Sequence, residues 1–527
     1  MSGYRKRAIA FSATFLVAFL LLVHSVAQAQ ALPERSTTNA PKNSLTQSPP
    51  DSAKPDDDAL QLLKDQFGEE WAKQAETPIK PLDAATESGQ TKPRSKLTAE
   101  PSSRTDLFLI ALEWILYAIV AILLVFTFRH FYFTLNRLFG RQRHPYVDID
   151  TADWPHITVM IAAHNEEAVI GDSIKALLEV DYPPDRITIM PMNDRSADRT
   201  REIIDDLVAQ FPGRIKPFHR STGKPGKAAA LKDATELTAS DVIIVFDADY
   251  LPGRGIIKQL VAPFFDPEVG AVMGRVVPLN GGRNLLTRML ELERAGGYQV
   301  DQQARMNLGL VPQYGGTVGG IRVSALKSVG GWHDDVLAED TDLTYRLLMG
   351  SWITVYTNRS ECYEEVPEDW AVRIKQIMRW SKGHNQAFFR HFWNLLSNAN
   401  IPWPQRIDGA LLLMVYALSP LLLIGWAIAL ALYLFKPDLL LSGVLAIFSM
   451  VAYSALGNFA AFFEIGAACY LDGTRNRLRL LPLNIAGFLV GMVAISRATF
   501  NQILWDRFKG ENSFKWDKTI RYRKTEK

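Results

Sequence analysis

Cysteine is nearly absent from this chain of 527 residues, which contains only Cys362 and Cys469. Two cysteines far apart give no sign of the disulfide framework that stabilises small secreted domains, so we expect the soluble region that holds Cys362 to be cytosolic. An excess of charge is also missing, since the formal net charge is +2. Bulk electrostatics therefore predict no nucleic-acid partner and no acidic one.

The sequence does contain long apolar runs. They lie at 8–26, 107–128, 408–435, 438–466 and 480–505. Each approaches or exceeds the roughly 20 residues that a helix needs to cross a bilayer. The chain is also too long for one compact core. We therefore expect a multi-pass membrane protein with a soluble domain inserted between its membrane segments.

The N-terminal hundred residues divide into two segments. Residues 1–31 have a basic start, an apolar stretch and the small-residue sequence Ala27-Gln28-Ala29, which indicates a signal peptide or, alternatively, an uncleaved N-terminal anchor. Residues 32–104 are rich in Pro, Ser, Thr, Asp and Lys. Such a composition buries too little apolar surface to fold, so we predict a disordered extracytoplasmic linker.

The orientation of the next segment follows from its flanks. A transmembrane helix is predicted at 105–135, and Arg137, Arg141 and Arg143 follow it. An excess of Lys and Arg marks the cytoplasmic end of a span. Residues 140–365 are therefore expected to form a cytosolic domain.

Apolar strands alternate with helical stretches in this domain. The predicted strands are 156–164, 186–194, 241–249 and 269–278, and the predicted helices lie near 167–180, 197–211 and 226–238. The alternation predicts an α/β fold with a mostly parallel sheet. Ligands of open α/β sheets bind beyond the carboxyl ends of the strands. Glu166, Asp194 and Asp247 each follow a strand there, so we expect one crevice to collect them.

Asp247 and Asp249 stand two residues apart where a buried strand ends. Side chains alternate along a strand, which places both carboxylates on the same side. Mg²⁺ or Mn²⁺ suits this pair, because a hard cation takes one or two carboxylates and completes its shell with phosphate oxygens and water. The sequence therefore predicts a metal site for a diphosphate. The alternative is a solvated turn.

Two further features lie on predicted helices. Lys227 begins a predicted helix, where free N–H groups and the helix dipole favour anions, although a solvated lysine is the alternative and Lys224 could take its place. Gln376, Arg379 and Trp380 share one face of a helix within 366–400. A guanidinium can fork onto phosphate and an indole can stack on a sugar. That helix could equally lie on the membrane surface, with Trp380 as an interfacial anchor.

The C-terminal part is expected to hold transmembrane or interfacial helices over 405–506 and a cytosolic tail over 507–527. Both flanks of 480–505 are basic, yet a span there would place them on opposite sides of the membrane. The second half of this segment carries Asn501 and Gln502. We therefore favour an interfacial or re-entrant element there.

Five motifs occur in order along the chain. They are Ala163-His164-Asn165-Glu166-Glu167, Asn193-Asp194-Arg195-Ser196-Ala197-Asp198, Phe246-Asp247-Ala248-Asp249, Ala338-Glu339-Asp340-Thr341-Asp342 and Gln376-Ile377-Met378-Arg379-Trp380. Together they resemble the membrane-embedded, inverting family 2 glycosyltransferases, which include cellulose, hyaluronan, chitin and poly-N-acetylglucosamine synthases. The resemblance covers about residues 155–400 and implies a GT-A-like domain and a hexosyltransferase.

The resemblance implies a role for each donor-site residue. Glu166 and Asp194 would hold the uracil and ribose of a UDP-sugar, with His164 near the base. His164 stands where the family more often has Tyr, and a core histidine is the alternative. Lys227 and Asp247 would bind the diphosphate, and Asp247 and Asp249 the metal.

The resemblance also assigns the reacting groups. Asp340 would be the general base and Glu339 would tune it, whereas the alternative is an acidic helix start. Gly316, Thr317, Gln376, Arg379 and Trp380 would meet the acceptor or the diphosphate. Near the C-terminus a further stretch resembles the loop that closes over nucleotide, Phe514-Lys515-Trp516-Asp517-Lys518-Thr519.

The expected activity is inverting transfer from a UDP-sugar to a growing β-linked polysaccharide with coupled export, at the bacterial inner membrane. Membrane lipids and accessory export subunits would be partners. Two alternatives remain. One is a non-processive enzyme that makes glucosyl-diacylglycerol, with a lipid acceptor. The other is a non-catalytic membrane protein that binds nucleotide sugar, against which the intact Asp247, Asp249 and Asp340 argue.

Overall fold

The computed structural model describes residues 104–144, 153–436, 441–445, 447–448, 462–506 and Tyr522. All of them belong to one compact unit. The predicted signal peptide or anchor, almost all of the predicted linker and the stretch resembling a closing loop at 514–519 lie outside the described residues.

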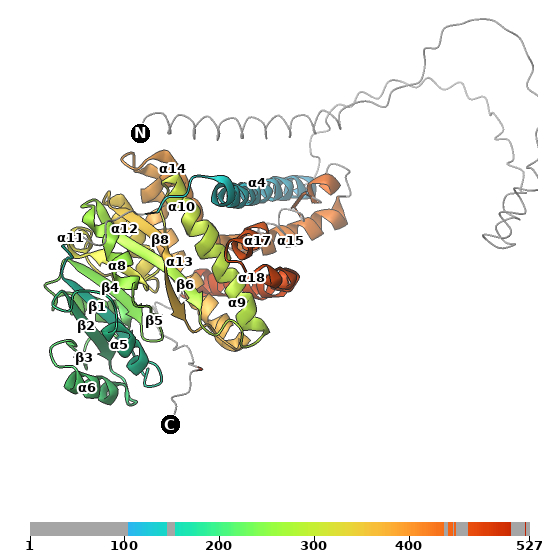
Figure 1. Ribbon diagram of the computed structural model, residues 1–527. Helices are drawn as coiled ribbons and strands as arrows, with labels where there is room; N and C mark the ends of the chain where they lie inside the picture. Colours follow the sequence, from blue (N-terminus) through green and yellow to red (C-terminus); the bar gives the residue numbers. More distant parts are fainter. Residues whose placement is uncertain are drawn as a thin grey trace, which may run out of the picture. The chain divides into compact units, whose positions relative to one another are not determined.

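An eight-stranded sheet forms the centre of the soluble part (Figure 1). Its strand order is β3-β2-β1-β4-β7-β6-β8-β5. The strands are β1 (Ile157–Ala163), β2 (Ile187–Asp194), β3 (Phe218–Arg220), β4 (Val242–Asp247), β5 (Leu251–Pro252), β6 (Val269–Pro278), β7 (Gly319–Arg322) and β8 (Ile353–Glu364).

Most of the pairings are parallel, which confirms the predicted sheet. β1 pairs with β2 and β4 in parallel, and β2 with β3 and β6 with β8 do the same. Only β7 and β5 run against their neighbours. In the register, Ala163 faces Asn193 and Ala162 faces Asp247, so the carboxyl ends of β1, β2 and β4 lie level. One edge of the sheet therefore collects the polar residues that follow these strands.

Helices cover both faces of the sheet, and the core is correspondingly split in two. In β1, Val159 and Ile161 enter one apolar cluster while Met160 enters another. A strand buried on both faces reads as a continuous apolar run, which is why the sequence predicts it well. The helices of this part include α5 (Ile170–Leu178), α6 (Thr200–Gln210), α7 (Lys227–Thr235), α8 (Ile256–Val261), α11 (Val323–Ser328) and α12 (Glu339–Met349), with the 3₁₀ turn η1 (Ala262–Phe265).

Strands β7 and β8 are absent from the sequence-based prediction, and their composition explains why. β7 has only four residues and begins Gly319-Gly320. A Cβ at Gly320 would come within 2.6 Å of the Phe264 ring, so close packing requires glycine there. β8 is rich in Thr, Asn, Arg, Ser and Glu, and its second half alternates between exposed and buried positions. Neither strand presents the apolar run that marks β1.

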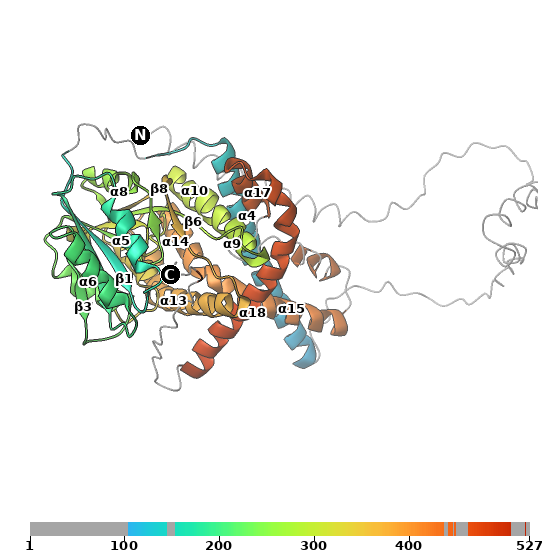
Figure 2. The ribbon, with the colours of Figure 1, turned by 60° about the horizontal axis from the view of Figure 1, so that its bottom comes forward.

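A helical connection leads from β6 to β7 and packs against the apolar helices beside the sheet. It consists of α9 (Leu285–Ala295), the π-helix η2 (Gly296–Gln302) and α10 (Gln303–Leu308). α9 packs on β6 and on α17 (Phe462–Leu471), and α10 packs on α4 (Arg104–Phe139), as Figure 2 shows. This connection is the bridge between the sheet and the apolar helices.

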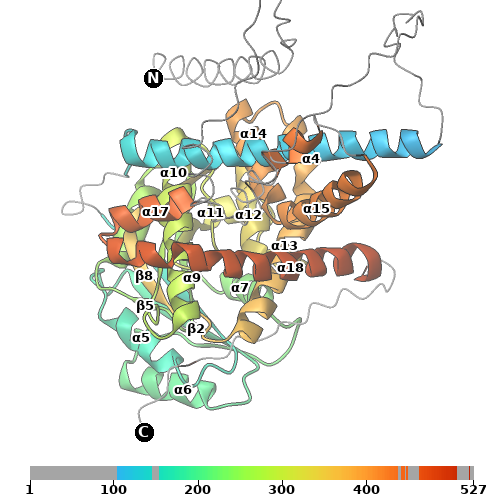
Figure 3. The same cartoon turned by 90° about the vertical axis from the view of Figure 1, so that its right-hand side faces the viewer.

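The apolar helices pack together beside the sheet domain. α15 packs on both α4 and α18, and α17 packs on α4 (Figure 3). These elements are α4 (Arg104–Phe139), α13 (Trp370–Ser397), α14 (Trp403–Met414), η3 (Val415–Ala417), α15 (Leu418–Phe435), α17 (Phe462–Leu471), η4 (Arg475–Leu483), α18 (Asn484–Asn501) and η5 (Gln502–Asp506).

Three helical stretches of the described chain are long and apolar enough to cross a membrane. They are Asp106–Phe139, Trp403–Phe435 and Arg475–Leu504. The last contains the segment expected to be interfacial. Two of its polar residues, Thr499 and Gln502, have a partner on α13, because Asn385 Nδ2 donates to Thr499 Oγ1 at 3.0 Å and to Gln502 Oε1 at 3.1 Å. These polar residues therefore serve helix packing, and the interfacial position of 480–505 stays a prediction.

Candidate active site

One cavity of about 430 Å³ brings together all of the predicted site residues except Gly316. Lys227, Asp194 and Asp247 lie on the side formed by the strand ends, which we call the donor side. The opposite side is formed by residues of α4, η2, α10, α13 and α14, and we call it the helical side. The predicted residues that line the cavity are His164, Glu166, Asp194, Lys227, Asp247, Asp249, Thr317, Glu339, Asp340, Gln376, Arg379 and Trp380.

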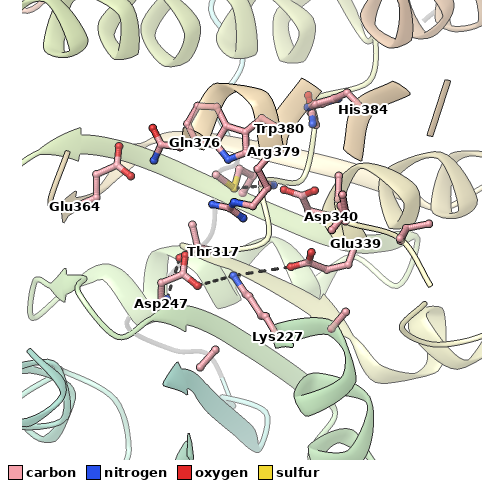
Figure 4. A pocket seen from close by; sticks show the side chains of 18 of the residues that line it. Lys227, Asp247, Thr317, Glu339, Asp340, Glu364, Gln376, Arg379, Trp380 and His384 are labelled. Carbon is pink, nitrogen blue, oxygen red and sulfur yellow. Dashed lines mark hydrogen bonds and ion pairs between the residues drawn. The ribbon is translucent and has the colours of Figure 1, made fainter. Parts of the chain in front are cut away.

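Lys227 links three parts of the donor side (Figure 4). It is the first residue of α7, and its Nζ donates to Asp247 Oδ1 at 2.6 Å and to the Gly316 carbonyl at 2.8 Å. Glu339 Oε1 lies 4.0 Å away. Burial alone would lower the pKa of Lys227, but the charges of Asp247 and Glu339 raise it above its ordinary value. The site therefore holds a permanent cation at a helix start, as phosphate binding requires.

Asp194 is held by four hydrogen bonds. Its carboxylate accepts from Arg195 Nε at 2.9 Å and Nη2 at 3.2 Å, from Arg220 Nη1 at 2.9 Å and from the Gly226 amide at 3.0 Å. Burial opposes ionisation, yet the bonds from Arg195 and Gly226 lower the pKa of Asp194 overall. The carboxylate therefore fixes the loop in front of Lys227. If Asp194 also binds ribose as predicted, the ribose would have to bond to carboxylate oxygens that already accept these hydrogen bonds.

His164 and Glu166 follow β1 at the same edge. His164 Nδ1 bonds to the Asp194 carbonyl at 2.6 Å, and Asn165 adopts a left-handed backbone with φ +56°. The amide of Glu166 donates to Thr200 Oγ1 at 2.8 Å and the residue is buried. Both side chains line the cavity, so a role in base binding stays a prediction for each of them.

The acid pair Glu339 and Asp340 begins helix α12. Asp340 Oδ1 accepts from the Thr341 amide at 2.6 Å. A Cβ on Gly316 would lie 3.1 Å from Asp340 Cβ, and Gly316 has φ +71°. Glycine is thus needed for the turn and for its close approach to the acid. Burial raises the pKa of Glu339 to about 7, although Lys227 lowers it.

Asp342, two residues later, has a different environment. It is fully buried and accepts from Arg346 Nε at 2.7 Å, with His391 Nε2 at 2.8 Å. Burial raises its pKa, but the bonds from His391 and Arg346 prevail and lower it well below its usual range. The two aspartates of one short motif therefore separate into a cavity residue, Asp340, and a structural one.

Helix α13 presents Gln376, Arg379 and Trp380 to the cavity, across from Asp247 and Lys227 in Figure 4. The guanidinium groups of Arg294 and Arg373 each lie 5.2 Å from the centre of the Trp380 ring. Cations at this distance are attracted to the face of an indole. Trp380 is therefore held by two arginines, and any sugar stacking would use the ring area that they leave.

Helix α13 also touches the turn that carries the acid pair. A Cβ at Gly383 would come within 2.7 Å of Ala338 Cβ and 2.9 Å of the Ala338 amide. Larger residues at either position would separate the helix from the turn. The spacing between Arg379 and Asp340 thus depends on two small residues.

The carboxylates at the end of β4 fit a divalent cation. Asp247 and Asp249 line the cavity with Glu365, whose Oε2 is buried and has no hydrogen-bond partner among the described residues. Within those residues no group of three or more His, Cys, Asp or Glu side chains forms a metal cluster. Two carboxylates with the remaining positions left to phosphate and water match the preference of Mg²⁺ and Mn²⁺.

Several cavity residues escape the sequence-based prediction. His384 lines the cavity, stacks on Tyr416 at 4.7 Å between ring centroids and has a pKa lowered by burial to about 4. Glu364 accepts from Arg294 Nε at 2.6 Å. The signal for His384 was its place one turn after Trp380 on a predicted helix. Glu364 is the last residue of β8, a strand that the sequence does not reveal, and Glu365 follows it.

Comparison with known proteins shows the family. A model described as "Glycosyltransferase like family 2" matches residues 155–383. A probable glycosyltransferase of Bacillus subtilis, YdaM, is 32% identical over 55% of this chain and 69% of its own length. The chain belongs to this family. It is therefore a family 2 glycosyltransferase, for which inversion is typical, and the resemblance of its motifs is confirmed.

Two other proteins similar to this glycosyltransferase have names that specify different activities. The beta-monoglucosyldiacylglycerol synthase of Synechocystis is 32% identical over 51% of the chain and 56% of its own length. Among solved structures, the mannosyltransferase PcManGT from Pyrobaculum calidifontis, in complex with GDP-Man and Mn²⁺, covers 71% of the chain and 98% of its own. Its identity is 20% and its TM-score 0.49.

Proposed function

We propose that this glycosyltransferase transfers a hexosyl group from a UDP-sugar to an acceptor hydroxyl, with inversion at the anomeric carbon. One observation carries the proposal. A single cavity contains a lysine at a helix start, a carboxylate pair at a strand end and a second acid pair across from them. The first two suit a nucleoside diphosphate, and the third suits proton removal.

Asp340 is the proposed base. It takes the proton of the acceptor hydroxyl while that oxygen forms a bond to the anomeric carbon. The bond from this carbon to the phosphate oxygen of UDP breaks, and UDP leaves with the electron pair. Asp340 is suited to the task because Thr341 fixes one of its oxygens at 2.6 Å and it stands in the first turn of α12. Glu339, beside it, positions Lys227.

Negative charge develops on the departing UDP, and cations on both sides of the cavity can stabilise it. Lys227 lies on the donor side and Arg379 projects from the opposite wall (Figure 4). Charged hydrogen-bond donors that are fixed in a site shielded from water stabilise a developing negative charge more strongly than they would in water. Asp247 and Asp249 would hold Mg²⁺ or Mn²⁺, which supplies further charge to the diphosphate when bound.

A growing β-linked polysaccharide is the first candidate acceptor. The cavity extends from the sheet edge to residues of α4 and α14, two elements within stretches long enough to span a membrane. A chain elongated at Asp340 would have helices beside it for export. This candidate places the enzyme in the cytoplasmic membrane with its sheet domain in the cytosol.

Diacylglycerol is the second candidate acceptor. It is favoured by the similarity to the Synechocystis beta-monoglucosyldiacylglycerol synthase. The three apolar helical stretches would keep the cavity at the membrane surface, within reach of a lipid headgroup. Such an enzyme transfers one sugar and releases the product.

Purified full-length protein in lipid nanodiscs decides between these candidates. It is incubated with Mg²⁺ or Mn²⁺ and with UDP-glucose or UDP-N-acetylglucosamine, and UDP release and product size are measured. Polymer retained at the origin of a thin-layer plate supports polysaccharide synthesis, and one new lipid spot supports glycolipid synthesis. NMR of the product should show a β-anomer. Absence of UDP release with every donor and metal would refute the proposed reaction.

A further inference from the structure

A group of buried charged residues on the helical side of the cavity has no part in the reaction described above. We call it the helix cluster, and it comprises Arg129, His130, Asp301, Arg305, Asp408 and Glu464. These residues come from α4, η2, α10, α14 and α17. Four of them, Arg129, His130, Asp301 and Arg305, line the cavity that also contains Asp340.

The helix cluster is closely connected internally. Arg129 donates through Nε to Asp408 Oδ1 at 2.8 Å and through Nη1 to Asp301 Oδ1 at 3.0 Å. Arg305 Nη2 lies 2.9 Å from Asp301 Oδ2, and His130 Nδ1 lies 2.6 Å from Glu464 Oε2. Its side chains are at most 17% exposed. Asp301 enters the cluster from the π-helix η2, a rare conformation that often occurs at functional sites.

Hydrogen-bonding capacity remains in the helix cluster after these contacts. Among the described residues, Arg129 Nη2 and Arg305 Nε have no acceptor, and Asp408 Oδ2 and Glu464 Oε1 have no donor. Leaving buried polar atoms unpaired costs stability. Because two of these atoms belong to residues that line the cavity, a ligand there could supply the missing partners.

The charges of the helix cluster decide the class of ligand. The guanidinium groups of Arg129 and Arg305 balance the carboxylates of Asp301 and Asp408, so these four side chains together carry no net charge. A charged ligand would leave a net charge in a buried site, which is costly. The unpaired atoms of residues that line the cavity, Arg129 Nη2 and Arg305 Nε, are both donors, and the oxygen of a hydroxyl group can accept a hydrogen bond from them.

We propose that the helix cluster is a binding site for the hydroxyl groups of a neutral polyol acceptor, which it holds while Asp340 acts on one of them. This inference rests on the proposed function, because it assigns the acceptor end of the same cavity. The polyol has two possible sources, the end of a glycan or the glycerol of a lipid. The shared chemistry is an uncharged group with adjacent hydroxyls.

The test compares Arg129→Lys with Arg137→Lys. Both arginines belong to α4 and both contact η2, since Arg137 Nε donates to the Gln299 carbonyl at 2.7 Å. Only Arg129 lines the cavity. Acceptor KM is measured with cellotriose and with dioctanoylglycerol, alongside the KM of the UDP-sugar, UDP release to water and the melting temperature.

For Arg129→Lys we expect the KM of one acceptor to rise about tenfold or more, because a hydrogen bond to a charged group is lost. Donor KM and UDP release to water should stay within about twofold, because Arg129 belongs to the helical side of the cavity and the residues proposed to bind the donor belong to the donor side. The acceptor whose KM rises identifies the source. Unchanged KM for both acceptors, or an equal rise in Arg137→Lys, would overturn the proposal.

A second measurement separates this inference from the proposed function. If the wild-type protein releases no UDP, saturation-transfer NMR with cellotriose or dioctanoylglycerol still reports acceptor binding. Signal transfer in the wild type that disappears in Arg129→Lys and persists in Arg137→Lys supports the site. No transfer to either probe in the wild type would refute it.

Discussion

On the donor side of the cavity, functional side chains follow directly from strand ends, whereas on the helical side they come from helices far apart in the sequence. Asp194 and Asp247 each end a strand of one parallel set. Arg129, Asp301 and Trp380 come from three separate helical elements. The donor side is thus fixed by sheet register, and the helical side by packing between helices.

The two sides of the cavity should respond differently to amino-acid substitution. On the donor side, backbone hydrogen bonds of β1, β2 and β4 hold each acid in place. On the helical side, positions depend on side-chain contacts such as Gly383 against Ala338. We therefore expect donor-side substitutions to remove chemistry without loss of fold, and helical-side substitutions to act through geometry.

The largest effect is expected at Asp340. Asp340→Asn removes the proposed base, and sugar transfer should fall by about 10²–10⁴-fold with little change in melting temperature. Transfer is measured as UDP release at saturating donor. Asp342→Asn is the matched control, because it alters the other aspartate of the motif, which is buried against Arg346 and His391.

Asp342→Asn should lower the melting temperature strongly, since removing one partner of a buried ion pair costs about 3–5 kcal/mol. If Asp340→Asn retained wild-type transfer, the base would have to be another group. If Asp342→Asn remained fully stable while activity disappeared, the separation of roles within the motif would be wrong.

The second-largest effect is expected at Lys227, the first residue of α7, and is compared with Lys224 in the loop before it. Lys227→Ala should reduce kcat by about 10²–10³-fold, because it removes a charge aimed at the leaving diphosphate. Lys224→Ala should have a much smaller effect, since Lys224 pairs with Asp334 at 3.6 Å. Steady-state kinetics with the same UDP-sugar compare the two variants. Equal losses would contradict the assignment of Lys227 over Lys224.

The sequence predicts the donor side well because its signals are local. Strands β1, β2, β4 and β6 are apolar runs, and a polar motif follows three of them. Strand alternation then places Asp247 and Asp249 together. On the helical side, helix spacing does the same for Gln376, Arg379 and Trp380. These inferences need only the geometry of one element each.

The remaining features need contacts that no local pattern records. β7 is short and glycine-rich, and β8 is polar, so neither resembles a buried strand. The helix cluster joins Arg129 to Asp408 across 279 positions of sequence. The arginines that hold Asp194 also have no pattern of their own. On the helical side of the cavity, the sequence therefore predicts only the residues that belong to a family motif.

A smaller effect is expected from Gly383, which tests the packing of the helical side. Gly383→Ala would bring a Cβ within 2.7 Å of Ala338 Cβ and displace the turn that carries Asp340. Overpacking of this kind costs about 1–3 kcal/mol of stability. Because the displaced turn carries the acid pair, kcat/KM should also fall, by about 5-fold to 100-fold. Gly491→Ala in α18 is the control, because a Cβ there would meet no described atom within 4 Å. Equal activity of the two variants would show that α13 does not position the acid pair.

The smallest effect is a pH dependence set by Glu339, where the two sides meet. Burial raises the pKa of Glu339 to about 7 from its ordinary value of 4.5, so the folded protein binds its proton more tightly than the unfolded chain does. Stability from this group is complete below the unfolded pKa and is lost as the pH rises through the folded one. Glu339→Gln removes this loss, so its melting temperature relative to wild type should increase between about pH 5 and pH 8. Glu236→Gln, at an exposed position after α7, should show no such trend. A constant difference for Glu339→Gln would mean that Lys227 keeps Glu339 ionised throughout, and that the donor side alone sets the charge of the acid pair.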